Sequence, residues 1–89
     1  MNIILITFQI NAAENRKILI ENIKKIGSWA RITMTTYCVK VNGMTAIEIR
    51  DRLMPLIENE CFLFVVEITK SSWGSYRLPE AVTNWLKNN

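Results

Sequence analysis

The sequence contains no histidine, which removes the residue that proteins use most often as a general base and as a metal ligand. It has only two cysteines, Cys38 and Cys61, which lie far apart and form no CxxC pair, so a structural zinc site is excluded. Both cysteines fall inside apolar runs. They indicate buried thiols in a reducing compartment rather than a disulfide scaffold.

Excess charge and long apolar runs are also scarce. Eleven basic residues face eight acidic ones, and the net charge of +3 permits an acidic partner without forming the dense basic face of a dedicated nucleic-acid binder. No apolar run approaches the ~20 residues of a transmembrane helix. The apolar N-terminal stretch lacks the positive region and the cleavage site of a signal peptide. We therefore expect a cytoplasmic protein that has no membrane partner.

The length and the apolar content predict one small globular domain. Of the 89 residues 49% are apolar, and we expect a core over residues 1–70 and a C-terminal tail over residues 71–89. A chain of this size buries only about two-thirds of its unfolded surface, so a homodimer would be a natural supplement. The tail is expected to pack either on its own domain or on a dimer partner.

Along the first half of the chain, the spacing of the apolar residues alternates between that of strands and that of a helix. Residues 2–10 form an Ile-rich run that predicts a strand buried on both faces. Asn11, with Glu14 three residues later, indicates the capped start of a helix that Gly27 ends in a left-handed conformation. The next residues are β-branched or aromatic. They predict two strands, about 29–34 and 36–42, joined by a tight turn that lacks glycine.

The second half contains the signals of a helix, a strand and a short C-terminal helix. Thr45 and Glu48 form the sequence of a capping box, and Pro55 predicts a kink or an irregular last turn in the helix that follows. Residues 60–70 contain another strand with apolar residues on both faces. After a loop over residues 71–75, the spacing predicts a short helix over residues 78–87, with a proline near its start.

The order βαββαβ, followed by a loop and a short helix, predicts a ferredoxin-like α+β fold with a four-stranded antiparallel sheet and two helices on one face. Alternation places apolar residues on both faces of the first and last strands, so the helix-free face carries an apolar patch. Self-association or cover by the tail would hide this patch. The interface candidates are Ile3, Leu5, Trp73, Tyr76 and Trp85.

Four segments, Ile6–Asn11, Lys25–Trp29, Thr35–Val39 and Ile49–Pro55, resemble the CRISPR-associated protein 2 superfamily, and most closely its small SinR-like branch. The resemblance covers residues 2–87 and includes the aromatic tail. It implies a homodimer with the ferredoxin-like fold. Members of the superfamily are metal-dependent nucleases, toxin-type RNases, or the non-catalytic bridge of the CRISPR integrase.

The nuclease members carry an aspartate at the tip of the first strand, one per subunit, and the pair binds a divalent metal at the dimer interface. The matching position here is Gln9, whose neutral amide supplies no charge to offset that of Mg²⁺. We therefore expect no catalytic residue, no metal site and no cofactor. Mg²⁺ would be needed only if the chain retained the activity of a divalent-metal-dependent endonuclease, which is the third and last function that we consider.

The first function is a non-catalytic module that binds DNA or RNA. Its candidate residues are basic, most of them on the first helix: Arg16, Lys17, Lys24, Lys25, Arg31 and Arg77. The second function is a protein-binding module of the antitoxin or immunity type, whose partner would be a toxin. The aromatic residues of the tail favour that alternative, because Trp and Tyr are common interface anchors.

Overall fold

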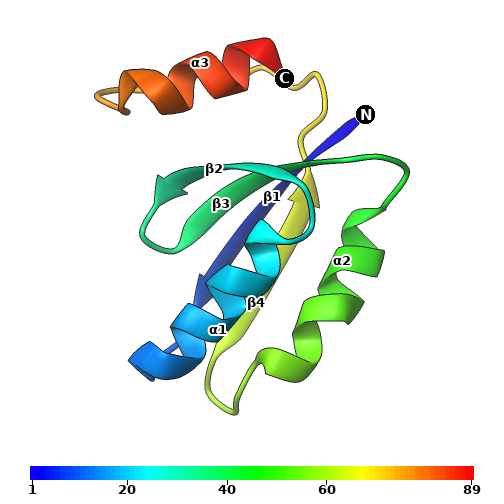
Figure 1. The fold of residues 1–89 in the computed structure, drawn as a ribbon, viewed down its shortest axis with the longest axis vertical. Coiled ribbons are helices and arrows are strands. Elements are labelled where there is room, and N and C mark those ends of the chain that lie inside the picture. Colours follow the sequence, from blue (N-terminus) through cyan, green and yellow to red (C-terminus); the bar gives the residue numbers. More distant parts are fainter.

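Strand β1 (Asn2–Gln9) lies inside a four-stranded antiparallel sheet of order β2-β3-β1-β4, and the computed structural model describes all residues from 1 to 89. Strands β2 (Ser28–Thr33), β3 (Thr36–Val41) and β4 (Phe62–Glu67) complete the sheet. Helices α1 (Ala13–Lys24) and α2 (Ala46–Leu53) lie on one face of it (Figure 1). This arrangement confirms the predicted ferredoxin-like α+β fold.

The hydrophobic core lies between the two helices and the sheet. Ile4 and Ile6 of β1 are fully buried, as are the residues of α1 and α2 that face them, Leu19, Ile23, Ile49 and Leu53. Phe8 belongs to the same cluster, and its ring stacks against that of Tyr37 on β3. Every second residue of β1 therefore points into this core, as the alternation in the sequence predicts.

Two details at the ends of α1 differ from the prediction. The N-cap is Ala12 rather than Asn11, and no side chain caps the helix there. The helix ends at Lys24, and Gly27 does not adopt a left-handed conformation, which among the glycines belongs to Gly43 with a φ of 81°. Gly27 is required for space instead, because a Cβ at this position would overlap the backbone oxygen of Lys40.

Threonines stabilise the β2–β3 turn, which contains no glycine. The turn consists of Met34 and Thr35, and the pairing register shifts between Arg31 and Thr33. The Thr35 N–H donates to Thr33 Oγ1 at 3.2 Å, and the Thr35 carbonyl accepts from the N–H of Phe8 at 3.0 Å. A local irregularity and these hydrogen bonds thus replace the left-handed turn residues of most two-residue hairpins.

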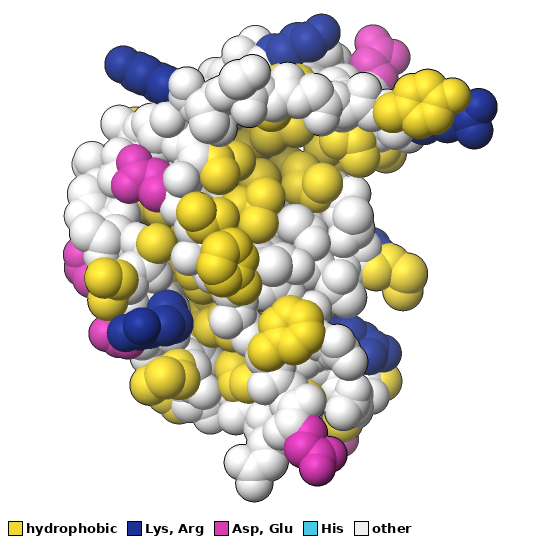
Figure 2. Space-filling view, turned by 180° about the vertical axis from the view of Figure 1, so that it is seen from behind, with side chains coloured by type: hydrophobic (Ala, Val, Ile, Leu, Met, Phe, Trp, Pro, Cys, Tyr) yellow, Lys and Arg dark blue, Asp and Glu magenta, His cyan; other side chains and the backbone are white.

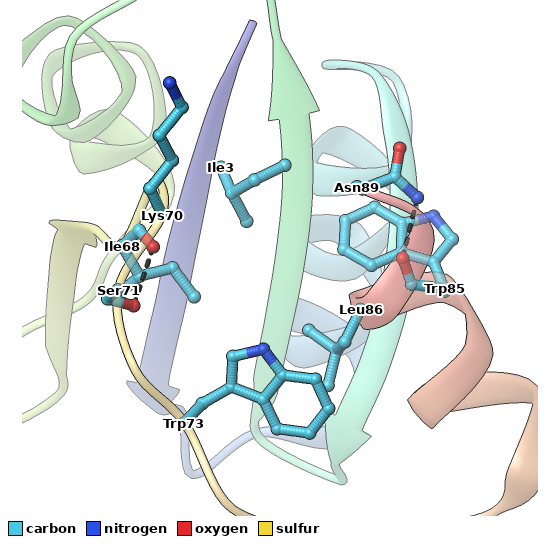
Figure 3. Close-up of a pocket in the computed structure, with 8 residues that line it drawn as sticks. All are labelled: Ile3, Ile68, Lys70, Ser71, Trp73, Trp85, Leu86 and Asn89. Atoms are coloured by element: carbon cyan, nitrogen blue, oxygen red, sulfur yellow. Dashed lines mark hydrogen bonds between the residues drawn. The ribbon is translucent and has the colours of Figure 1, made fainter.

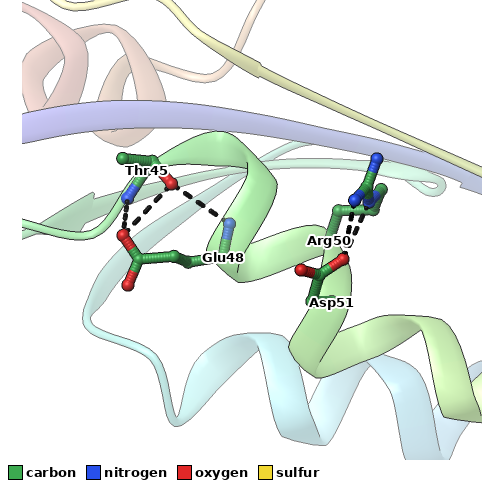
Figure 4. Close-up of polar contacts among 4 residues, drawn as sticks. All are labelled: Thr45, Glu48, Arg50 and Asp51. Atoms are coloured by element: carbon green, nitrogen blue, oxygen red, sulfur yellow. Dashed lines mark hydrogen bonds and ion pairs between the residues drawn. The ribbon is translucent and has the colours of Figure 1, made fainter.

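Helix α2 begins as its sequence predicts. Thr45 Oγ1 accepts from the Glu48 N–H at 3.1 Å, and a Glu48 carboxylate oxygen accepts from the Thr45 N–H at 3.3 Å (Figure 4). The helix gives way to a 3₁₀ turn, η1 (Met54–Leu56), at Pro55. The predicted irregular last turn is therefore present, since proline cannot continue the α-helical hydrogen bonds.

The tail lies over the helix-free side of the sheet. Helix α3 (Glu80–Asn88) runs along β2, and Trp85 Nε1 donates to Ser28 Oγ at 3.0 Å. Figure 3 shows Trp73 and Leu86 above the same face, over the central strands. Ile3, Ala30 and Cys38 are buried on this face although neither α1 nor α2 covers it. No helix of the chain combines the length and apolar character needed to cross a bilayer.

The tail leaves part of the helix-free face uncovered. Hydrophobic side chains gather in the hollow beneath the tail and continue across the face below it (Figure 2). On β4, Phe62 and Phe64 remain 52% and 57% exposed. The apolar patch that the sequence predicts is therefore covered at β2 and open at β4.

The close approach of the Gly27 and Lys40 backbones can be tested by substitution. We expect Gly27→Ala to lower the free energy of unfolding by about 1–3 kcal/mol, because the new methyl group forces the Gly27 and Lys40 backbones apart. Gly74→Ala is the control, since nothing lies within 4 Å of a Cβ there. Urea denaturation measures both, and equal unfolding midpoints for the two variants would contradict the packing assigned to Gly27.

Burial should also make the two thiols react differently. Cys38 is 1% exposed beneath the tail, and burial raises its pKa to about 11, whereas Cys61 is half-buried. Because the thiolate is the reactive form, we expect a thiol reagent at neutral pH to label native Cys61 well before Cys38. The variants Cys38→Ala and Cys61→Ala isolate each thiol for mass spectrometry. Equal labelling rates in the native protein would show that the tail does not cover Cys38.

Candidate nucleic-acid-binding surface

Two lysines of α1 lie on the side of the helix that faces β2. Lys17 and Lys24 are seven residues apart, which places them on one side two turns apart. The Lys24 Nζ lies 4.4 Å from the centre of the Trp29 ring on β2. The opposite side of α1, with Asn15 and Ile18, faces the segment after α2. The two lysines therefore extend along the border between α1 and β2.

Arg31 adds a third cation from β2. It points to the same face of the sheet as Trp29, since the two residues pair with the core residues Tyr37 and Val39 of β3. Trp29 is 40% exposed, and its ring packs against Tyr37 with 5.9 Å between the ring centres. We call Lys17, Lys24, Trp29 and Arg31 the basic surface.

The cations of the basic surface have no acidic partner. The only ion pair of the molecule joins Arg50 and Asp51 on α2, with 2.8 Å between Arg50 Nη2 and Asp51 Oδ1 (Figure 4). Asp51, the only aspartate in the sequence, is thus an exposed surface acid. Glu14 and Glu21 of α1 are exposed but form no ion pair with the basic surface. Both glutamates lie one helical turn from Lys17 and reduce the positive charge there, while Lys24 and Arg31 remain without an ion pair.

The other predicted basic residues lie elsewhere. Arg16 is half-buried, and its Nη1 donates to the Ile10 carbonyl at 2.9 Å, which ties the start of α1 to the end of β1. Lys25 is exposed at the end of α1, one helical step away from the Lys17–Lys24 side. Arg77 lies in the tail, 4.8 Å from the ring centre of Tyr76. The structure brings together only three of the six candidates.

Gln9 lies at the exposed end of β1 and pairs with Phe62 of β4. Because antiparallel partners point to the same face, the amide of Gln9 lies next to an exposed phenylalanine. The chain contains no cluster of three or more acidic, cysteine or histidine side chains suited to a metal ion. The tip of β1 thus presents an amide and an apolar ring instead of carboxylates.

The predicted interface residues fall into two groups. Ile3 is buried, Leu5 is half-buried, and the Trp85 side chain is held by Ser28, so these three contribute to the contact between sheet and tail. Trp73 and Tyr76 keep 42% and 79% of their surface exposed.

The prediction from sequence missed two features. Phe62 and Phe64 fall in the strand predicted over residues 60–70, but only the path of the tail shows that they stay uncovered. The sequence predicts Trp29 only as part of the strand over residues 29–34, and its place just after a basic helix is the one signal for its position at the basic surface. Comparison of the sequence with models of known protein families and with curated proteins finds no match. The chemistry of the surface is therefore derived from its own residues.

Proposed function

We propose that the chain is a non-catalytic, homodimeric nucleic-acid-binding module related to the CRISPR-associated protein 2 superfamily. One observation carries the proposal: Lys24 lies over the partly exposed Trp29 ring, Arg31 points to the same face of the sheet, and neither cation forms an ion pair. Cations that have no acidic partner bind phosphates by releasing the counterions of the nucleic acid.

The spacing of the cations suits a nucleic-acid backbone. Seven helical residues separate Lys17 from Lys24 by about 10 Å along the axis of α1. One strand of a duplex advances about 3.4 Å for each phosphate, so the two lysines span roughly three nucleotides. A small site of this kind binds with modest affinity that depends on salt. A dimer would double the net charge of +3 and present two such sites.

The proposal that the chain is non-catalytic rests on the amide at Gln9 and on the position of the only aspartate. The position of the family aspartate holds an amide beside Phe62, and the sole aspartate is engaged with Arg50 on α2. Nothing at the tip of β1 offers the carboxylates that Mg²⁺ prefers. The free thiols Cys38 and Cys61 fit the reducing cytoplasm, where we place the protein.

The open edge of β4 supports the proposed homodimer. This strand forms one edge of the sheet, and the Ile68 N–H donates to the Ile3 carbonyl. By alternation the backbone groups of Leu63 and Val65 point away from β1 and lack a strand partner. With Phe62 and Phe64 exposed on the adjoining face, the β4 edge of a second copy offers both backbone hydrogen bonds and apolar burial.

The alternative function is a protein-binding module of the antitoxin or immunity type, which would neutralise a toxin. The observation that favours it is the exposure of Trp73 and Tyr76 in the tail. Aromatic residues of this kind anchor many interfaces. Under this alternative the basic surface is a solvated side of α1.

Charge reversal tests the nucleic-acid-binding function. We expect the double variant Lys17→Glu, Lys24→Glu to weaken binding of a fluorescent oligonucleotide by about tenfold or more, and to lower the slope of log affinity against log salt by about one or two. Fluorescence anisotropy across a salt series measures both quantities.

The control is the double variant Lys25→Glu, Lys87→Glu, which has the same net charge but changes two exposed lysines outside the basic surface. Equal weakening in both variants would mean that the location of the charge is irrelevant. If the wild-type chain binds neither single-stranded nor duplex probes at low salt, the proposed function is wrong and the protein-binding alternative is favoured.

The dimer makes a separate prediction. We expect wild-type protein to sediment at about twice the mass of the 10.3 kDa chain, and Phe64→Lys to sediment as a monomer, because a charge on an open edge opposes strand pairing. The control Tyr76→Lys changes the most exposed aromatic of the tail and should remain dimeric. Dissociation by Tyr76→Lys alone would assign the interface to the tail instead of β4.

A further inference from the structure

Strand β2 has different surroundings on its two faces. Ser28 and Ala30 point to the face that the tail covers, whereas Trp29 and Arg31 point to the face that carries α1. As an edge strand, β2 forms backbone hydrogen bonds with β3 alone. Apart from β3, helix α3 is the element that packs most extensively against it. The tail therefore supports the same strand that carries two members of the basic surface.

Trp85 is the residue through which α3 holds β2. Its Nε1 donates to Ser28 Oγ at 3.0 Å, and this is the only hydrogen bond between α3 and the sheet. Ser28 precedes Trp29 in the chain, and Ala30, which follows Trp29, is buried on the tail side. The tail thus contacts β2 on both sides of the position at which Trp29 leaves the strand for the opposite face.

The contact between α3 and the sheet is a weak one. No residue of α3 is fully buried, and Trp85 and Leu86 are only half-buried. The segment over residues 71–77, which leads to the helix, is exposed throughout. An element with so few buried contacts opens at a lower free energy than the domain as a whole. The tail therefore has two states, docked on β2 and released from it.

We propose that Trp85 is a positioning residue for nucleic-acid binding, because it docks α3 on one face of β2 and thereby holds Arg31 in place on the other. This inference rests on the proposed function and adds the element that controls its site. The pairing of β2 with β3 shifts register between Arg31 and Thr33, and the Arg31 side chain forms no ion pair. With the tail released, only this irregular pairing fixes the strand, and Arg31 loses its defined position.

Substitution of Trp85 in the full chain tests this inference. The probes are fluorescent dT10 and a blunt DNA duplex of mixed sequence. We expect Trp85→Ala to weaken binding by about fivefold or more, which is the lower end of typical couplings between two sites. The slope of log affinity against log salt should fall by about one, because the phosphate contact of Arg31 is lost although no charge is removed. Anisotropy across a salt series measures both.

Milder variants keep the test decisive if Trp85→Ala does not fold. Trp85→Phe and Ser28→Ala each remove the hydrogen bond between α3 and β2 and keep an aromatic ring at position 85. Both should weaken binding by the same smaller factor, and the double variant should show no further loss. The control Tyr76→Ala removes the most exposed aromatic ring of the tail and should leave affinity and slope unchanged.

The Cys38 thiol reports whether the tail is docked. It is buried beneath the tail, so in a Cys61→Ala background release of α3 should speed its reaction with a thiol reagent. We expect Trp85→Ala to raise the labelling rate of Cys38, while circular dichroism melting shows that the domain remains folded. An unchanged labelling rate would show that Trp85 does not hold the tail, and would overturn the inference.

The binding results separate this inference from the proposed function. Faster labelling of Cys38 with unchanged affinity would overturn the positioning role. A lower affinity with an unchanged salt slope would also overturn it, since a direct contact between Trp85 and the nucleic acid has that signature. In both cases the nucleic-acid-binding function stands if charge reversal at Lys17 and Lys24 weakens binding. A wild-type chain that binds neither probe would refute both.

Discussion

Burial of both faces of one strand is the constraint on which the rest of the structure depends. Strand β1 places Ile4, Ile6 and Phe8 beneath α1 and α2, and it places Ile3 and Leu5 on the side that these helices cannot reach. Two helices cover one face of a four-stranded sheet, so the second apolar face needs another cover. The tail provides it over β2 and the centre of the sheet, and no segment of the chain provides it at β4.

The same constraint explains where the candidate site lies. Helix α3 reaches the edge of β2 in order to cover the sheet, and Trp85 then meets Ser28 near the end of α1. This contact joins the tail to β2 on the face of the sheet opposite to Trp29 and Arg31, which point toward α1. The basic surface is thus a consequence of core formation: the packing of α1 against the sheet sets Lys24 over the Trp29 ring, on the same face as Arg31.

Much of the fold could be predicted from the sequence because short-range patterns determine it. The alternation in β1, the capping box at Thr45 and the irregular turn at Pro55 are local signals, and the structure agrees with each. Gly27 shows where local reasoning fails. Its role depends on Lys40, a residue of another strand, and a glycine at a helix end gives no information about a distant carbonyl. The site was predictable only as a set of six basic residues. Whether a charge joins the surface depends on tertiary contacts such as the hydrogen bond from Arg16 to Ile10.

The two edges of the sheet differ in what packs against them. Both β2 and β4 are edge strands, and helix α3 packs against β2 but not comparably against β4. A sheet that could extend at both edges would recruit copies without end, as fibres do. In the proposed dimer, two copies pair through β4, and α3 remains packed against β2 in each copy. Helix α3 therefore leaves β4 as the edge at which the two copies meet.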